Sequence, residues 1–351
     1  MTGTKMLYSL LRPLLFMLEP ERAHHWALEG LAWSERLRLA GPLFGGLSVP
    51  PPLSTQVMGL SFPNPLGLAA GLDKNGDYID ALATLGFGFI EVGTVTPRPQ
   101  IGNPQPRLFR LPARRALINR MGFNNLGVDH LAARLAASGH RGIVGVNIGK
   151  NADTALERAV DDYLHGMNRL YPLASYITVN LSSPNTPGLR SLQEGAAFSA
   201  LLERLKSAQA ALATEHRRYV PLVIKIAPDF DRGAVEALGA QLLQFEVDGV
   251  IATNTTVSRQ GVEGEVLAKE AGGLSGRPLL HPTNEVLRWL AEVLEARIPI
   301  IGCGGVEDAW SFEQKRTAGA QLVQLYTALI YQGPWLVRRM LAELALHQQR
   351  A

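Results

Sequence analysis

Eight short apolar segments, each ending in glycine or polar residues, constrain this chain more than any other feature. They cover residues 66–71, 87–94, 142–149, 176–183, 221–228, 249–256, 298–305 and 320–327. Helical patterns fill the intervals, for example residues 196–218 and 233–247, so strands and helices alternate. Eight such units within roughly 300 residues predict an α/β fold of the TIM (β/α)8 barrel type.

A doubly wound open sheet is the competing architecture. It is disfavoured because no G-x-G-x-x-G follows the first apolar segment and the glycine pairs come only after the seventh. The interval at residues 96–125 is proline-rich, basic and too long for a single helix. A loop of that length within a compact domain usually serves as a lid or a binding element.

Two amphipathic helices are predicted before the barrel. In the first, leucines recur at helical spacing at positions 7, 10, 11, 14 and 18, and the second covers residues 21–41. A Pro/Gly-rich linker, residues 41–53, follows them. Three interpretations stay open for this hairpin: it docks on the core, it anchors the protein at a membrane surface, or it forms an apolar tunnel for a greasy substrate.

Composition excludes several classes of function. Cys303 is the only cysteine, so no intrachain disulfide or zinc cluster is expected, and a reducing compartment is indicated. The formal net charge is +3 and the basic residues are scattered, which argues against nucleic acid as a partner. No HExxH motif or histidine cluster supports a metal site. No segment reaches the roughly 18 apolar residues of a bilayer-spanning helix.

Lys225 lies inside the apolar segment VIKIAP, where an ammonium group is costly to bury without an anionic partner. Three roles are compatible with this position. The lysine stabilises a cofactor that becomes negative on reduction, forms a Schiff base with a carbonyl substrate, or pairs with a buried carboxylate such as Asp229.

Asparagines and glycines gather at the predicted strand ends, which meet at one face of a barrel. Amides that both donate and accept hydrogen bonds suit a planar, neutral heterocycle, although each asparagine alone is more often a turn or cap residue. The five asparagines are at positions 119, 147, 180, 185 and 254. The glycine pair after the seventh segment predicts phosphate binding, with an ordinary tight turn as the alternative.

Longer motifs carry a family resemblance. They include NPLGLAAGLDKNG at residues 64–76, INRMGFNNLG at 118–127, NLSSPNTPGLR at 180–190, IATNTT at 251–256, IIGCGGV at 300–306 and QLYTALIYQGP at 324–334. In these motifs the sequence resembles the membrane-associated, quinone-linked dihydroorotate dehydrogenases of bacterial type. The resemblance implies a TIM barrel that uses FMN to oxidise dihydroorotate to orotate in pyrimidine synthesis and passes the electrons to ubiquinone or menaquinone.

The resemblance also implies a role for individual residues. FMN would contact Ala69, Ala70, Gly71, Leu72, Asp73, Thr94, Asn147, Asn180, Lys225, Thr253, Gly276, Gly305, Tyr326 and Thr327. The substrate would contact Lys74, Asn119, Arg120, Met121, Gly122, Phe123, Asn180, Asn185, Asn254 and Thr255. The quinone entrance would involve Arg110, Tyr326 and His24.

Ser183 is the expected catalytic base. It would remove a proton from C5 of dihydroorotate while hydride leaves C6 for the flavin, assisted by an oriented water or Thr186 and enclosed by the Phe123 loop. The soluble branch of the superfamily uses cysteine here and lacks the N-terminal helices. Serine and the helical hairpin therefore both select the quinone-linked branch.

The resemblance divides the chain into a helical membrane and quinone-tunnel domain, residues 1–45, and an FMN-binding barrel, residues 46–351. It places the protein peripherally on the cytoplasmic side of the cell membrane. The main rival function is a Schiff-base aldolase or lyase with Lys225 as nucleophile. A non-enzymatic scaffold explains neither the polar strand ends nor this lysine. The sequence leaves open which quinone is used, how deeply the hairpin inserts, and whether the chain is a monomer.

Overall fold

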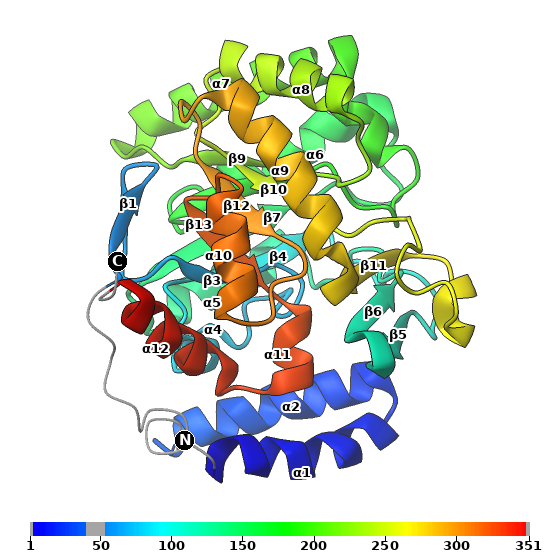
Figure 1. Cartoon of the computed structure of the whole chain (residues 1–351). Coiled ribbons are helices and arrows are strands. Elements are labelled where there is room, and N and C mark those ends of the chain that lie inside the picture. The colour runs from blue at the N-terminus through cyan, green and yellow to red at the C-terminus, as the bar shows by residue number, and fades with distance from the viewer. Residues whose placement is uncertain (1–2, 40–52, 349–351) are drawn as a thin grey trace.

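Eight parallel strands close into a barrel in the computed structural model, which describes residues 3–39 and 53–348 (Figure 1). Around the barrel the strands follow one another as β3 (Leu66–Leu68), β4 (Phe89–Val95), β7 (Ile143–Ile148), β8 (Tyr176–Asn180), β9 (Leu222–Ile226), β10 (Gly249–Ala252), β12 (Ile300–Cys303) and β13 (Leu322–Leu325). Each coincides with one of the eight predicted apolar segments. The predicted TIM barrel is confirmed.

Helices cover the outside of the barrel. They are α4 (Ile79–Ala83), α5 (Val128–Ala137), α6 (Ala159–Leu170), α7 (Gly195–His216), α8 (Arg232–Gln244), α9 (Leu280–Leu294), α10 (Ala309–Thr317), α11 (Thr327–Gln332) and α12 (Leu336–Gln348). Local sequence explains where some begin. The Asp231 side chain accepts a hydrogen bond from Ala234 N at the start of α8, and Asp308 and Ser311 form a capping box at the start of α10.

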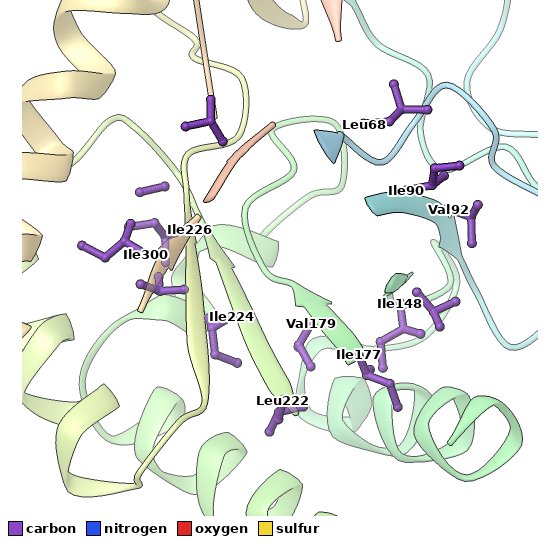
Figure 2. Packing of buried hydrophobic residues seen from close by; sticks show 14 of the residues in the cluster. Leu68, Ile90, Val92, Ile148, Ile177, Val179, Leu222, Ile224, Ile226 and Ile300 are labelled. Carbon is purple, nitrogen blue, oxygen red and sulfur yellow. The ribbon is translucent and has the colours of Figure 1, made fainter. Parts of the chain in front are cut away.

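Along each strand, side chains point alternately outward to the helices and inward to the barrel interior. Figure 2 shows the helix-facing layer, in which Val179, Ile224 and Ile300 belong to one continuous buried cluster. Aromatic rings fill the interior at the end where the strands begin, because glycines on neighbouring strands leave them room. A Cβ atom on Gly67 would lie 2.2 Å from the Phe89 ring, and one on Gly145 would lie 2.1 Å from the Tyr176 ring.

A short antiparallel hairpin, β1 (Thr55–Val57) and β2 (Leu60–Phe62), supplies Val57 and Phe62 to this inner cluster. The Phe62 and Phe89 rings pack edge to face with their centroids 5.2 Å apart. The N-terminal end of the barrel is therefore filled by side chains, which leaves chemistry to the C-terminal ends of the strands.

The long segment at residues 96–125 contributes part of a second sheet. Its strands β5 (Leu108–Leu111) and β6 (Ala116–Asn119) pair with β11 (Gly273–Gly276) in the order β11-β6-β5, all antiparallel. In the register, Asn119 lies opposite Gly273. This sheet, whose strands come from two distant loops, was not predicted.

The two predicted N-terminal helices are present as α1 (Gly3–Met17) and α2 (Pro20–Arg36), and Figure 1 shows them side by side at one end of the barrel. They dock partly through buried apolar residues of α2, of which Leu28 belongs to the main core cluster. Polar groups add to this: Tyr8 donates a hydrogen bond to Ile330 O, and Tyr78 donates one to Glu29. Helix α2 ends at Arg36, earlier than predicted. The predicted linker lies almost entirely outside the described residues, as does the domain boundary at residues 45 and 46.

Docking leaves apolar side chains of this hairpin exposed. Leu14, Met17 and Trp26 are 62%, 82% and 61% exposed, whereas Arg12 donates a hydrogen bond to Tyr331 O of the barrel. The leucine face of α1 therefore points away from the core. No helix within residues 3–39 and 53–348 is both long and apolar enough to cross a bilayer.

Candidate active site

A cavity of about 460 Å³ opens at the C-terminal ends of the barrel strands. Its size lies within the range of small-molecule and cofactor sites. Most of the predicted site residues line it: Ala69, Ala70, Gly71, Leu72, Asp73, Lys74, Thr94, Asn119, Met121, Gly122, Phe123, Asn180, Ser183, Asn185, Lys225, Thr253, Asn254, Thr255, Gly276, Gly305, Tyr326 and Thr327. Residues scattered over the sequence thus share one space.

Four residues with predicted roles lie outside this lining: Asn147, Arg120, Arg110 and Thr186. Asn147 is fully buried beneath it, and the Arg120 guanidinium turns away to bind Glu270 at 2.6 Å and to cover the Phe109 ring. Arg110 lies between the barrel and α1, where it donates a 3.0 Å hydrogen bond to Leu18 O. The backbone of Arg120 is engaged as well, because its N–H donates to Arg107 O and its carbonyl accepts a bond from Asn103 Nδ2.

Lys225 is 5% exposed and reaches the cavity without a hydrogen-bond or ion-pair partner in the described part of the chain. The suggested pairing with Asp229 is wrong, because the Asp229 carboxylate binds Arg190 at 2.6 Å and the Thr256 hydroxyl. A buried ammonium without a counterion is costly. The site therefore fits an anionic or electron-rich group placed beside Lys225.

Glu91 anchors a hydrogen-bond network below the cavity. Its buried carboxylate accepts bonds from Asn147 Nδ2 at 2.8 Å, from the Tyr176 hydroxyl at 2.9 Å and from Gln324 Nε2 at 2.8 Å. Because a carboxylate only accepts, it fixes the Asn147 amide with its oxygen toward the cavity. That oxygen then accepts a bond from the Thr94 hydroxyl at 2.5 Å.

The network continues into the loop after β8. Asn180 Nδ2 donates to Asn147 Oδ1 at 3.2 Å, which turns the Asn180 oxygen toward Ser182 and Asn254. Asn254 Nδ2 also donates to the Ser182 hydroxyl at 2.9 Å. Ser182, to which the sequence assigned no role, therefore joins two of the predicted ligand-binding amides. Because the Asn254 amide comes from the loop after β10, no local signal revealed this link.

The Ser183 hydroxyl borders the cavity and is 5% exposed. Its oxygen accepts a 3.2 Å hydrogen bond from Asn185 N. Within the described residues no hydrogen bond joins the hydroxyl groups of Ser183 and Thr186, so the relay through Thr186 stays a prediction. The side chain of Asn185 donates to Asn119 O at 3.2 Å and so ties this loop to the second sheet.

Arg190 holds the loop that carries Ser183. Its Nε donates to Ser182 O at 3.1 Å, its Nη2 donates to Thr255 O at 2.8 Å, and its Nη1 binds Asp229 at 2.6 Å. One guanidinium thus joins the loops that follow β8, β9 and β10. Arg190 was not among the predicted site residues, although it is the last residue of the motif NLSSPNTPGLR.

Lys74 brings a second cation to the cavity. Burial lowers its pKa to about 8, opposed by the nearby Glu21 carboxylate. Asp73 does not pair with it directly, because its carboxylate caps the turn by accepting hydrogen bonds from Tyr78 N and Asp77 N. Lys74 is therefore free to meet an anion at pH 7, where most of it is protonated.

The turn after β12 provides an exposed-backbone cradle. Gly304 and Gly305 have φ values of 112° and 79°, which other residues rarely adopt. A Cβ atom on Gly305 would lie 2.3 Å from Leu280 N, at the first residue of α9. The close approach of this turn to a helix N-terminus suits a phosphate group.

His24 and Tyr326 line the same cavity, with His24 contributed by α2. Burial, with the Lys74 and His25 charges, lowers the His24 pKa to about 3, so its ring is neutral at physiological pH. Arg110 lies apart from them, with its guanidinium 4.6 Å from the Phe16 ring centroid. The three predicted quinone-entrance residues thus lie in two places: His24 and Tyr326 line the cavity, and Arg110 lies beside Phe16 of α1.

Across residues 3–39 and 53–348, no group of three or more histidine, cysteine or acidic side chains could hold a metal ion.

Comparison with known proteins identifies the family. The family model described as dihydroorotate dehydrogenase matches residues 52–347. The chain belongs to the dihydroorotate dehydrogenase family. It is accordingly an oxidoreductase.

Relatives named "Dihydroorotate dehydrogenase (quinone)" match nearly the whole chain. The one from Acinetobacter baumannii is 56% identical over 334 residues, covering 95% of this chain and 98% of its own. That from Ralstonia nicotianae is 57% identical over 342 residues, covering 97% and 98%. Among solved structures, the Eimeria tenella DHODH in complex with ferulenol has a TM-score of 0.85 at 36% identity, covering 94% of this chain and 92% of its own.

Proposed function

We propose that this protein oxidises (S)-dihydroorotate to orotate in de novo pyrimidine synthesis, with FMN as cofactor and a respiratory quinone as electron acceptor. The observation that carries the proposal is one cavity in which Ser183 and Lys74 meet a set of asparagine amides above the unpaired Lys225. Family membership and the quinone-linked relatives support the same reaction.

FMN is supported by the fit of the residues around the cavity. When bound, FMN supplies the hydride acceptor of the reaction. Lys225 provides the charge that an electron-rich isoalloxazine needs, and the turn of Gly304 and Gly305 provides the phosphate cradle. The proposed FMN-binding residues are Ala69, Ala70, Gly71, Leu72, Asp73, Thr94, Asn147, Asn180, Lys225, Thr253, Gly276, Gly305, Tyr326 and Thr327. Asn147 would act from below, by orienting Thr94 and Asn180.

The proposed substrate residues are Lys74, Asn119, Arg120, Met121, Gly122, Phe123, Asn180, Asn185, Asn254 and Thr255. Lys74 would bind the carboxylate of dihydroorotate, because it lines the cavity and, with a pKa of about 8, is mostly charged at pH 7. The amides would pair with the C=O and N–H groups of the cyclic ureide. Arg120 fits this set least well, because its side chain binds Glu270 and its backbone N–H bonds to Arg107 O.

Ser183 would remove the C5 proton of dihydroorotate. A serine hydroxyl is a weak base at neutral pH, so it needs an acceptor for its own proton, either an ordered water or Thr186. The Phe123 loop would close over the substrate and exclude bulk water. The Ser183 hydroxyl suits this role because, among the described residues, it only accepts a bond, from Asn185 N, which leaves its proton uncommitted.

The helical hairpin is proposed as a membrane-facing quinone tunnel, residues 1–45, in front of the catalytic barrel, residues 46–351. Its outward leucine face and Trp26 suit the interfacial region of a bilayer. His24, Tyr326 and Arg110 would border the path of ubiquinone or menaquinone. The proposal includes peripheral attachment on the cytoplasmic side of the cell membrane.

One experiment tests the proposal directly: steady-state oxidation of dihydroorotate with a quinone, fumarate or NAD offered as separate acceptors. Efficient turnover with quinone alone is expected. Indifference to quinone with fast use of fumarate or NAD would overturn the quinone assignment.

The Schiff-base lyase considered as a rival from the sequence is not supported, because the chain belongs to an oxidoreductase family, although Lys225 has no partner in the described part of the chain. The two candidates differ in colour. A yellow protein that bleaches on adding dihydroorotate supports the oxidoreductase. A colourless protein that is covalently trapped by borohydride and a ketone supports the lyase.

A further inference from the structure

Lys315 is a fully buried lysine that the proposed chemistry does not use. It lies on α10 with 0% of its surface exposed, and its ammonium group donates a hydrogen bond to the Thr283 hydroxyl of α9. No carboxylate forms an ion pair with it anywhere in residues 3–39 and 53–348. Its aliphatic stem packs against β12, where a Cβ atom on Gly302 would lie 3.2 Å from Lys315 Cδ.

Thr283 links this buried cation to the glycine turn after β12. Its hydroxyl donates to Leu279 O at 2.6 Å and lies 3.3 Å from Gly304 O. Gly305, the next residue, packs directly on Leu280 at the first turn of α9. Lys315 therefore lies immediately behind the backbone that forms the cradle, on the side away from the cavity.

An ammonium group without a carboxylate is an expensive group to bury. Burial lowers the Lys315 pKa to about 7; the Cys303 thiol on β12 opposes this shift and the Arg288 cation on α9 adds to it. A lysine is not needed merely to fill the space at position 315, because a methionine has a similar length and carries no charge that is costly to bury. A nearby anion would compensate it, since Coulomb interactions in a protein interior are weakly screened.

We propose that Lys315 is a positioning residue for the cofactor phosphate: its buried ammonium group, held by Thr283, stabilises a phosphate dianion bound at the turn of Gly304 and Gly305. The inference rests on the proposed function, in which the cofactor is FMN. Lys315 acts from behind the turn and does not line the cavity. It therefore favours phosphorylated flavin over flavin that lacks the phosphate.

The test compares FMN with riboflavin, which has the same ring system and no phosphate. The full-length chain is freed of flavin, and each flavin is titrated against it by fluorescence quenching. Lys315→Met is expected to weaken FMN binding about tenfold or more and to leave riboflavin binding within about twofold of wild type. Lys269→Met, which removes an exposed lysine, is the matched control and should change neither affinity.

A second variant keeps the test decisive if Lys315→Met does not fold. Thr283→Val removes the hydroxyl that joins the ammonium group to the turn while keeping the charge and the side-chain volume. We expect a severalfold loss of FMN affinity with riboflavin affinity unchanged.

Three outcomes would overturn the inference. Equal losses for both flavins would show that Lys315 only supports the fold, and unchanged FMN affinity in both variants would show that its charge is irrelevant. In these two cases the wild-type preference for FMN survives and the proposed function stands. A wild-type chain that does not prefer FMN to riboflavin would instead remove the phosphate site itself and refute the proposed cofactor as well.

Discussion

The Glu91 carboxylate on β4 accepts a 2.8 Å hydrogen bond from Asn147 Nδ2 on the adjacent strand β7. Because only the amide nitrogen can donate, this bond decides which way the Asn147 amide faces. The orientation passes to Asn180 and then to Asn254 through hydrogen bonds of 3.2 and 3.3 Å. A buried charge in the barrel centre thus sets the donor and acceptor order of groups at its mouth.

Replacing Glu91 with glutamine should weaken orotate binding about tenfold, because the new amide can donate and so no longer dictates the Asn147 orientation. The measurement is the orotate-induced change in the flavin spectrum. Tyr176→Phe is the matched control, since it removes a different bond to the same carboxylate. Orotate affinity like that of wild type in the Glu91 variant would refute the orientation mechanism.

Ser183→Ala should lower the rate of flavin reduction by dihydroorotate by about 10²–10⁴-fold, the usual contribution of a positioned acid or base. The protein should remain yellow, because Ser183 is not expected to hold the cofactor. Anaerobic stopped-flow absorbance measures this rate. Ser182→Ala provides a contrast: it breaks the bond to Asn254 and should raise KM more than it lowers kcat. Near-normal reduction in Ser183→Ala would exclude this residue as the base.

Orotate affinity should fall as the pH rises above about 8. The pKa of Lys74 is lowered to about 8 by burial, so the cation that would meet the orotate carboxylate is present below this pH and is lost above it. His24 does not contribute, because its pKa of about 3 keeps it neutral across this range. Titration between pH 6 and 9.5 measures the effect.

Lys74→Met should bind orotate weakly at every pH in that range and show a flat profile. A variant that keeps the wild-type pH dependence would assign it to another group.

Arg190→Lys should slow turnover about ten- to a hundredfold, since an ammonium group cannot replace a guanidinium that joins three loops. The loop at residues 180–190 should also be cleaved faster by proteases, because its attachment to the loops after β9 and β10 is weakened. Asp229→Asn tests the same clamp from its other side and should have a smaller effect, since the hydrogen-bond geometry can persist. Equal turnover in wild type and Arg190→Lys would remove the clamp from the mechanism.

Trp26→Glu should reduce binding to anionic phospholipid vesicles and slow turnover with a long-chain quinone, while a water-soluble dye acceptor is reduced at the wild-type rate. Trp26 is 61% exposed on the hairpin, and a carboxylate is poorly tolerated at the lipid interface. Trp310→Glu is the matched control, because Trp310 is 57% exposed on α10 of the barrel. If both variants bind vesicles equally well, the hairpin is not the membrane-binding element.

The sequence alone predicted the eight barrel strands and both N-terminal helices. These elements depend on local properties: short apolar segments followed by glycine or polar residues, and leucines at helical spacing. Because parallel strands of a barrel all end at one face, the same patterns brought Ser183, Lys74, Lys225 and the cavity-lining asparagines to one place. Motif resemblance then supplied the roles expected of them.

Tertiary structure alone decided the partners of these side chains. Asp229 binds Arg190 and leaves Lys225 without a partner among the described residues, Arg120 turns toward Glu270, and the leucine face of α1 points outward. The sheet β11-β6-β5 joins Asn119 to Gly273, more than 150 positions away in the chain. In each case, groups far apart in the sequence compete for partners. Distance and burial in the folded chain decide which group binds, and no local sequence pattern encodes these two quantities.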